Sequence, residues 1–181
     1  MSKKEEIIIV TAELLQIQGY HATGLNEIIA KSGSPKGSLY HYFKNGKDEI
    51  VIAALQFSGE QVRLLLQSAA DNTANMQDFV STVVDYFIKL LKDSKYTKGC
   101  PVATTALETS GSNPELDQTI QAIYASWKQV LLAKMDKKNK NPEIVAETLV
   151  SLLEGALLSA KIQKSAKPLE YVKAVAKKIL K

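Results

Sequence analysis

Cysteine, histidine and tryptophan are scarce in this chain, and their scarcity excludes several classes of protein. Among 181 residues there are one cysteine, two histidines and one tryptophan. A single cysteine forms no disulfide within the chain, which agrees with a reducing cytoplasm. Both histidines precede residue 42, whereas the cysteine stands at position 100. No nucleophile, base or metal ligands cluster in the sequence, so we expect no enzyme, no metal and no cofactor.

Long apolar runs are absent as well. The run Ile7–Val10 near the N-terminus is short and follows two glutamates, so we expect no signal peptide. No run approaches the length that crosses a bilayer, which argues against a membrane partner. The apolar share of 45% nevertheless suffices for a sizeable core, in one compact unit or two small ones. These features predict a cytoplasmic globular protein.

Helical periodicity recurs along the chain, whereas alternating strand patterns, repeats and low-complexity tracts do not. Asn-Pro or Lys-Pro pairs begin three of the expected helices, and proline suits the first helical position. The helices are expected to begin near residues 3, 24, 35, 47, 76, 101, 114, 142 and 167, the first ending at Gly19 and the last reaching Lys181. We therefore predict an all-α fold of about nine helices.

The stretch from Thr23 to Lys47 is the most informative part of the chain. Its first helix ends at Gly33, which can adopt C-cap angles. Ser34 as N-cap and Pro35 at the first helical position predict a second helix. Two short helices joined by a tight turn match a helix-turn-helix, whose second helix enters the DNA major groove. An ordinary helical hairpin fits the bare pattern equally well.

The outer side of the second helix suits contact with DNA. Leu39 and Phe43 lie one turn apart and are expected to face the core. The residues expected to face outward are Lys36, Ser38, Tyr40, His41 and Tyr42. Hydroxyl, imidazole and ammonium groups bind base edges or phosphates. The net charge of +4 does not indicate DNA binding, because residues 1–49 hold six lysines and six acidic residues. Only the local placement of the lysines argues for DNA.

The run from Gly19 to Ile50 closely resembles the DNA-binding signature of the TetR family of bacterial repressors. The matching parts are Gly19-Tyr20, Thr23, Ile28-Ile29-Ala30, Gly33, the block from Gly37 to Phe43, and Lys47. The resemblance implies a three-helix DNA-binding headpiece in residues 1–46 and a helical ligand-binding and dimerisation domain in residues 47–181. It also implies a homodimer on a palindromic double-stranded operator. The residues that it assigns to DNA are Thr23, Lys36, Ser38, Tyr40, His41, Tyr42 and Lys47.

Some positions depart from the usual family pattern. Gly24 stands where the family usually has Ser or Thr, and Gly46 looks like an extra residue before the fourth helix. The segments Ser34–Lys36 and Lys98–Val102 resemble the branch that contains drug- and flavonoid-responsive regulators. The resemblance thus implies a regulator whose effector is a small apolar or aromatic molecule.

Residues 76–135 combine large apolar side chains with small polar ones, as ligand cavities in helical bundles do. The candidates for effector binding are Phe87, Cys100, Thr104, Leu107, Tyr124 and Trp127. Aromatic residues at helical spacing are usually plain core, so the pattern by itself favours core for any one of them. The family resemblance supports a cavity, because its members commonly bind small effectors in this region.

Cys100 has two interpretations. It lies at a helix start near Lys98, and both features lower the pKa of a thiol and favour the reactive thiolate. A redox- or electrophile-sensing regulator on the same scaffold is therefore an alternative. A free cysteine is also often a small buried filler, which is the commoner case.

The last two expected helices predict a dimer surface. Apolar residues cover more than one face of the helix that begins at Pro142, so one face can serve the core and another a partner. The candidate interface residues are Leu149, Leu152, Ala156, Val172 and Val175. The second face could instead pack within one chain. Taken together, the patterns and the resemblance indicate a dimeric, all-helical repressor that a small ligand releases from DNA.

Overall fold

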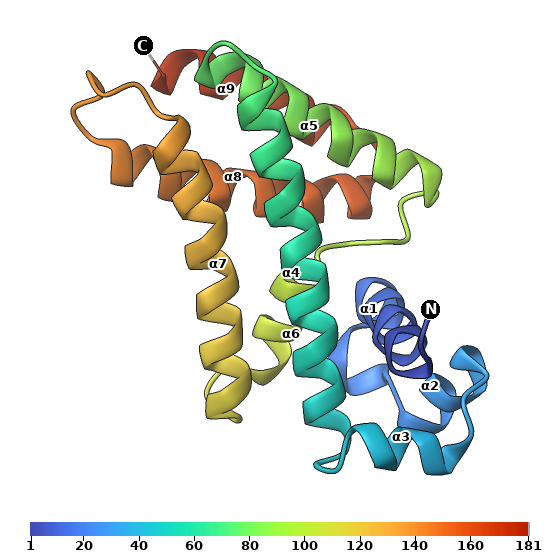
Figure 1. The fold of residues 1–181 in the computed structure, drawn as a ribbon. Helices are drawn as coiled ribbons and strands as arrows, with labels where there is room; N and C mark the ends of the chain where they lie inside the picture. Colours follow the sequence, from blue (N-terminus) through green and yellow to red (C-terminus); the bar gives the residue numbers. More distant parts are fainter. Residues whose placement is uncertain (181) are drawn as a thin grey trace. The chain divides into compact units, whose positions relative to one another are not determined.

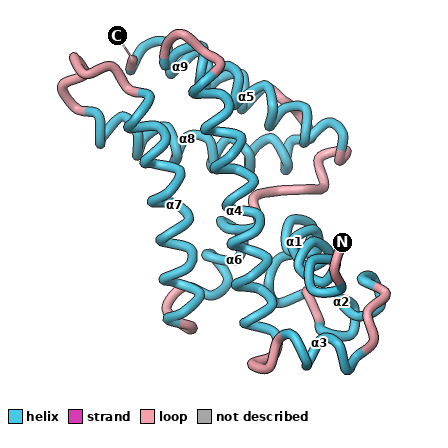
Figure 2. The backbone as a smooth tube through the Cα atoms, in the orientation of Figure 1, coloured by secondary structure: helices cyan, strands magenta, loops and turns pink. Residues whose placement is uncertain are grey.

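The computed structural model describes residues 1–180, and this range contains nine α-helices (Figure 1). No strand occurs in the same range (Figure 2). The helices are α1 (Lys3–Ala22), α2 (Leu25–Ser32), α3 (Lys36–Tyr42), α4 (Lys47–Asp71), α5 (Met76–Asp93), α6 (Pro101–Thr109), α7 (Pro114–Lys134), α8 (Pro142–Gln163) and α9 (Lys167–Ile179). The all-α prediction is confirmed; Lys181, which the last predicted helix included, lies outside the described residues.

The chain forms two compact units, each built from two stretches of sequence. The first unit combines Met1–Glu60 with Pro101–Ile123, and the second combines Gln61–Cys100 with the residues from Tyr124 onward. This grouping differs from the division expected after residue 46, because α4 and α7 each contribute to both units. The reason is packing: Ile50 near the start of α4 belongs to the same apolar cluster as the headpiece helices.

That cluster forms the core of α1, α2, α3 and the first turns of α4. Its members are Ile7, Leu14, Ile28, Leu39, Phe43 and Ile50, none of them more than 2% exposed. Burying a side chain of this size contributes roughly 1.5–3 kcal/mol. Because α3 has only seven residues, too few for a stable isolated helix, it depends on the packing of Leu39 and Phe43. The prediction that these two residues face the core is confirmed.

The regular part of α1 ends at Gly19, whose φ of 80° and ψ of −172° are not helical. Glu108 of α6 fills the break that Gly19 creates. Its Oε2 accepts a hydrogen bond from the backbone N–H of His21 at 2.7 Å. The backbone angles at Gly19 require glycine, and a Cβ there would lie only 2.1 Å from Oε1 of Glu108, so it would displace the carboxylate.

The second unit contains α5, α8 and α9, and each of these helices contacts the other two. Leu149, Ala156 and Val172 are 0%, 8% and 3% exposed, so they belong to the core of this unit. Their predicted place on a dimer surface is therefore corrected. Spacing alone could not show which apolar face of α8 turns inward. Leu152 is half-buried, and Val175 is 37% exposed.

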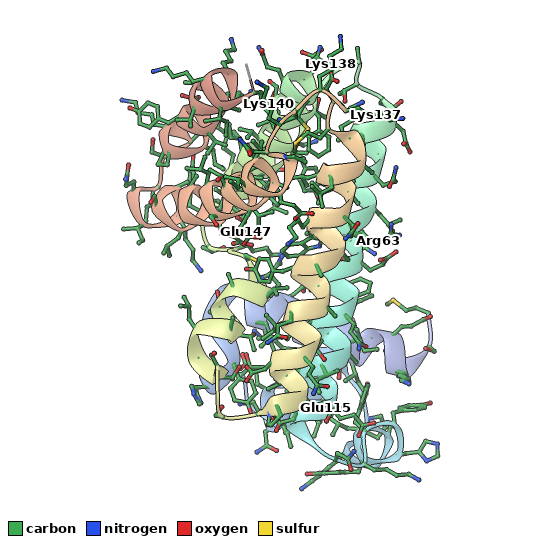
Figure 3. All side chains as sticks on the ribbon, turned by 90° about the vertical axis from the view of Figure 1, so that its left-hand side faces the viewer. Arg63, Glu115, Lys137, Lys138, Lys140 and Glu147 are labelled. Carbon is green, nitrogen blue, oxygen red and sulfur yellow. The ribbon has the colours of Figure 1, made fainter. Side chains whose placement is uncertain are left out.

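Three further features of the described residues are relevant to function. The loop between α7 and α8 exposes Lys137, Lys138 and Lys140 at one end of the second unit (Figure 3). No helix within residues 1–180 has both the length and the apolar character of a membrane-spanning segment. Within the same range, no three histidine, cysteine or acidic side chains gather as a metal site would require.

Candidate nucleic-acid interface

The turn between α2 and α3 sets the direction of α3. Gly33 is the C-cap of α2 and adopts a left-handed conformation with φ of 60°, as its position predicts. The N-cap of α3 is Pro35, whose extended ψ of 142° places Ser34 one residue outside the cap. The Ser34 hydroxyl is buried and has no hydrogen-bond partner among residues 1–180. The prediction that Ser34 caps α3 is therefore wrong.

The outer face of α3 is accessible, as its sequence predicts. Tyr40 is 45% exposed and Tyr42 37%, while Lys36 and His41 are also exposed. Ser38 is half-buried. The rings of His41 and Tyr42 meet edge to face, with centroids 5.1 Å apart. The face thus presents an ammonium group, an imidazole and two phenols side by side on a helix whose opposite side is buried in the core.

The local charge around α3 is positive. No acidic residue occurs from Ile28 to Lys47. Lys31 forms an ion pair with Glu27 at 3.0 Å, which partly neutralises its charge. Lys36 and Lys44 are exposed and form no ion pair with the described residues. These two ammonium groups are available to neutralise phosphates beside the groups on α3.

Thr23 has a different role from the expected one. It is fully buried, and its hydroxyl donates a hydrogen bond to the carbonyl oxygen of Gly19 at 2.6 Å. The hydroxyl therefore closes the end of α1 and is not presented to a phosphate, which corrects the expectation for this residue. The resemblance could not show this, because a matching position does not reveal which side of the chain a hydroxyl faces.

Lys47 at the start of α4 lies over the ring of Tyr20, with Nζ 4.1 Å from the ring centroid. Partial burial lowers the pKa of Lys47. The Tyr20 hydroxyl donates to Oδ1 of Asp48 at 2.5 Å, and Asn113 donates to Oδ2 at 2.7 Å. Burial and the Asp48 carboxylate together raise the pKa of Tyr20 to about 12. These contacts join the end of α1, the first turn of α4 and the start of α7, and they orient Lys47.

The second unit holds a polar cluster that includes a residue the sequence did not single out. The Tyr124 hydroxyl donates to Oε1 of Glu154 at 3.2 Å, and the Cys100 thiol is hydrogen-bonded to the same carboxyl. The Trp127 ring meets the Tyr124 ring edge to face at 5.0 Å. Burial is the largest influence on Glu154 and raises the pKa of its carboxyl. The signal that was missed is one acidic residue within the apolar stretch of α8, between Leu153 and Gly155.

Three of the six predicted effector residues, Cys100, Tyr124 and Trp127, are thus brought together. Phe87 lies on α5, half-buried, with its ring against that of Tyr86. Thr104 belongs to the first unit and packs beside Gly19. Leu107 is 83% exposed, so the expectation that it lines an interior site is corrected.

Comparisons with known proteins agree with this arrangement. Residues 7–54 match the family model for bacterial regulatory proteins of the tetR family, and residues 77–175 match the C-terminal domain of LmrA/YxaF-like transcriptional regulators. The uncharacterized HTH-type transcriptional regulator YxaF of Bacillus subtilis is 33% identical over 92% of this chain and 88% of its own length. The HTH-type transcriptional regulator LmrA of the same species is 30% identical over 98% and 96%.

A solved structure shares the fold. A crystal structure of a regulatory protein TetR from Rhodobacter sphaeroides superposes with a TM-score of 0.88, covering 97% of each chain at 20% identity. The match extends over all nine helices of the described residues, whereas the sequence signature covers only the first part of the chain. Together with the two family models, these likenesses show that the chain belongs to the TetR family of bacterial transcriptional regulators.

Proposed function

We propose that this regulator is a repressor that binds a palindromic operator as a homodimer and leaves it when a small apolar or aromatic effector binds. The main support is the exposed face of α3 on a buried scaffold. Lys36, Ser38, Tyr40, His41 and Tyr42 make its contacts, with Lys47 at the start of α4. Phosphate contacts set the position of the helix, and the imidazole and hydroxyl groups read base edges.

The dimer uses apolar residues that remain exposed on the last two helices. They are Ile144, Leu158 and Ile162 on α8, and Tyr171 and Val175 on α9, between 37% and 72% exposed. The α8 residues recur at intervals of fourteen and four, which places them on one helical face. An exposed apolar face of this kind supports a two-fold interface, and paired helices would form a four-helix bundle. Of the five interface residues predicted from the sequence, Leu152 and Val175 remain candidates.

A dimer can be tested directly by sedimentation of Ile162→Asp. A carboxylate placed in an apolar interface costs several kcal/mol unless it is paired, so the variant should shift to monomer with its helix content retained. Lys89→Asp places the same side chain at an exposed position of α5 and should leave the assembly intact. A dimer that survives Ile162→Asp at all concentrations would place the interface elsewhere.

Release from DNA requires an effector that binds one conformer better than the other. Coupling free energies of about 1–3 kcal/mol are typical of allostery. The cluster of Cys100, Tyr124 and Trp127 supports the second unit as the effector-binding part of the chain. The protein would act in the cytoplasm, where operator and effector meet.

The decisive experiment is a mobility-shift titration with the DNA that flanks the gene. Specific binding should saturate at a site with two-fold symmetry and exceed binding to random DNA by at least about a thousandfold. A footprint should cover two half-sites one helical turn or a multiple of a turn apart. Equal affinity for random and flanking DNA would contradict operator recognition.

A thiol sensor that uses Cys100 is the second candidate. Cys100 is half-buried and contacts Glu154, which gives the thiol a defined environment. The nearby carboxyl disfavours a thiolate when it is ionised, and this weakens the case compared with a thiol beside cations alone. Cys100→Ser should abolish oxidant-induced release from operator if the thiol is the sensor. Unchanged release in this variant would exclude it.

A further inference from the structure

The cluster of Cys100, Tyr124 and Glu154 contains a carboxyl without a cation. Glu154 contacts a hydroxyl and a thiol, and it forms no ion pair with the described residues. On the same helix, Glu143 and Glu147 are exposed, and both lie near the Lys128 ammonium, at 3.7 and 3.6 Å (Figure 3 labels Glu147). The exposed carboxylates of α8 thus share a cation, while the sheltered one has only neutral donors.

A sheltered carboxyl that has only neutral partners is unusual in a protein core. A carboxyl that is removed from water is normally paired with a cation or replaced by an apolar group. Two neutral donors compensate only part of the lost hydration, which is why burial still raises the pKa of Glu154. A cation would therefore interact more favourably with the Glu154 carboxylate than with the water-exposed carboxylate of Glu147.

The aromatic residues beside Glu154 suit the same ligand. Tyr124 donates a hydrogen bond to the carboxyl, and the centroids of the Trp127 and Tyr124 rings are 5.0 Å apart. Phenol and indole rings attract cations through their π-electrons, and indole does so most strongly. Cys100, Tyr124 and Glu154 are half-buried, so the carboxyl and the phenol are partly open to solvent, whereas Trp127 is only 4% exposed.

We propose that Glu154 is the anchor of an effector site for small organic cations, in which Glu154 binds an ammonium group and Tyr124 and Trp127 hold the attached apolar part. The inference rests on the proposed function, because it names the chemical class of the effector. It concerns binding to the second unit, so it can be measured without DNA.

The test compares two probes of equal shape on the whole protein. Benzyltrimethylammonium carries a permanent positive charge, and neopentylbenzene is its uncharged isostere. Trp127 is the only tryptophan, so its fluorescence reports binding at the cluster directly. The wild-type protein should bind the cation at least about tenfold more tightly than the isostere.

Two variants test whether the charge of Glu154 causes that preference. Glu154→Gln removes the charge and keeps the shape, so it should abolish the preference for the cation. Glu147→Gln removes a carboxylate from the exposed face of the same helix and should leave the preference unchanged. Melting curves of both variants show whether the fold is retained.

Equal binding of the two probes, no saturable quenching by the cation, or an unchanged preference in Glu154→Gln would each overturn the proposal. Failure of operator binding would be a separate result: it would refute the repressor function and leave the fluorescence measurement intact. Cation binding that depends on Glu154 and lowers operator affinity would support both.

Discussion

Glu108 accepts a hydrogen bond from the backbone N–H of His21 at 2.7 Å, and its side chain occupies the space that a Cβ on Gly19 would need. The carboxylate of one helix thereby satisfies a backbone donor at the break in another. Such charge-assisted bonds are stronger than neutral ones. The contact joins α6 to the end of α1, next to the turn that leads into the helix-turn-helix.

Gly19→Ala should therefore destabilise the protein substantially. The backbone angles at Gly19 are almost exclusive to glycine and cost about 1–3 kcal/mol in other residues, and displacement of Glu108 adds to that cost. Chemical denaturation would measure the loss. Gly37→Ala is the matched control, because a Cβ at this exposed helical position meets nothing within 4 Å; it should be neutral or stabilising by up to about 1 kcal/mol. Equal stabilities of the two variants would contradict the role of the break.

Ser34→Ala distinguishes two descriptions of the start of α3. A serine that caps a helix is worth about 0.5–2 kcal/mol, so its removal destabilises. Here the hydroxyl is buried without a partner in the described part of the chain, and removing an unsatisfied group should stabilise the protein by about 1 kcal/mol. Denaturant midpoints would give the sign. A loss of stability would restore Ser34 as the cap of α3.

His41→Ala should lower operator affinity without loss of helix content. Removal of one base-edge contact typically costs about 1–3 kcal/mol, and the loss should be smaller on random DNA. Lys36→Ala should instead weaken binding to both DNAs and reduce the slope of log affinity against log salt by about 1. Mobility shifts at several salt concentrations separate these effects. If His41→Ala binds operator like the wild type, His41 lies outside the interface.

The raised pKa of Glu154 predicts a pH-dependent stability. A carboxyl that holds its proton more tightly when folded makes the folded protein more stable below its ordinary pKa of 4.5 and less stable as pH rises through the higher folded value. Relative to wild type, Glu154→Gln should gain stability across that window and keep the gain at higher pH. The neighbouring Tyr124 phenol stays protonated there, because burial raises its pKa above the ordinary value. A difference that does not change with pH would contradict the burial of Glu154.

Much of the first unit could be predicted from sequence, because its determinants are local. Gly33 ends α2, and Leu39 and Phe43 turn inward one helical turn apart. The exposed side of α3 follows from that inner side by geometry. The net charge of the first 49 residues did not indicate DNA binding, because the acidic residues offset the lysines. Only the run from Ile28 to Lys47, which contains no acidic residue, indicated a positive surface.

The second unit was harder to predict because its helices carry apolar residues on several sides. Periodicity placed Leu149 and Val172 on an outer face, whereas packing among α5, α8 and α9 buries them and exposes Ile162 and Tyr171 instead. Glu154 could not be recognised as part of a cluster, because Cys100 and Tyr124 approach it from distant parts of the chain.

The sequence by itself determined that this protein is helical, roughly where most of its helices begin, and which side of α3 faces outward, because these properties depend on neighbours within one or two turns. Only the tertiary structure decided that Thr23 closes α1, that Glu108 fills the break at Gly19, and which apolar face of α8 is covered. Those outcomes depend on side chains that meet across distant segments, and helical periodicity carries no information about such partners.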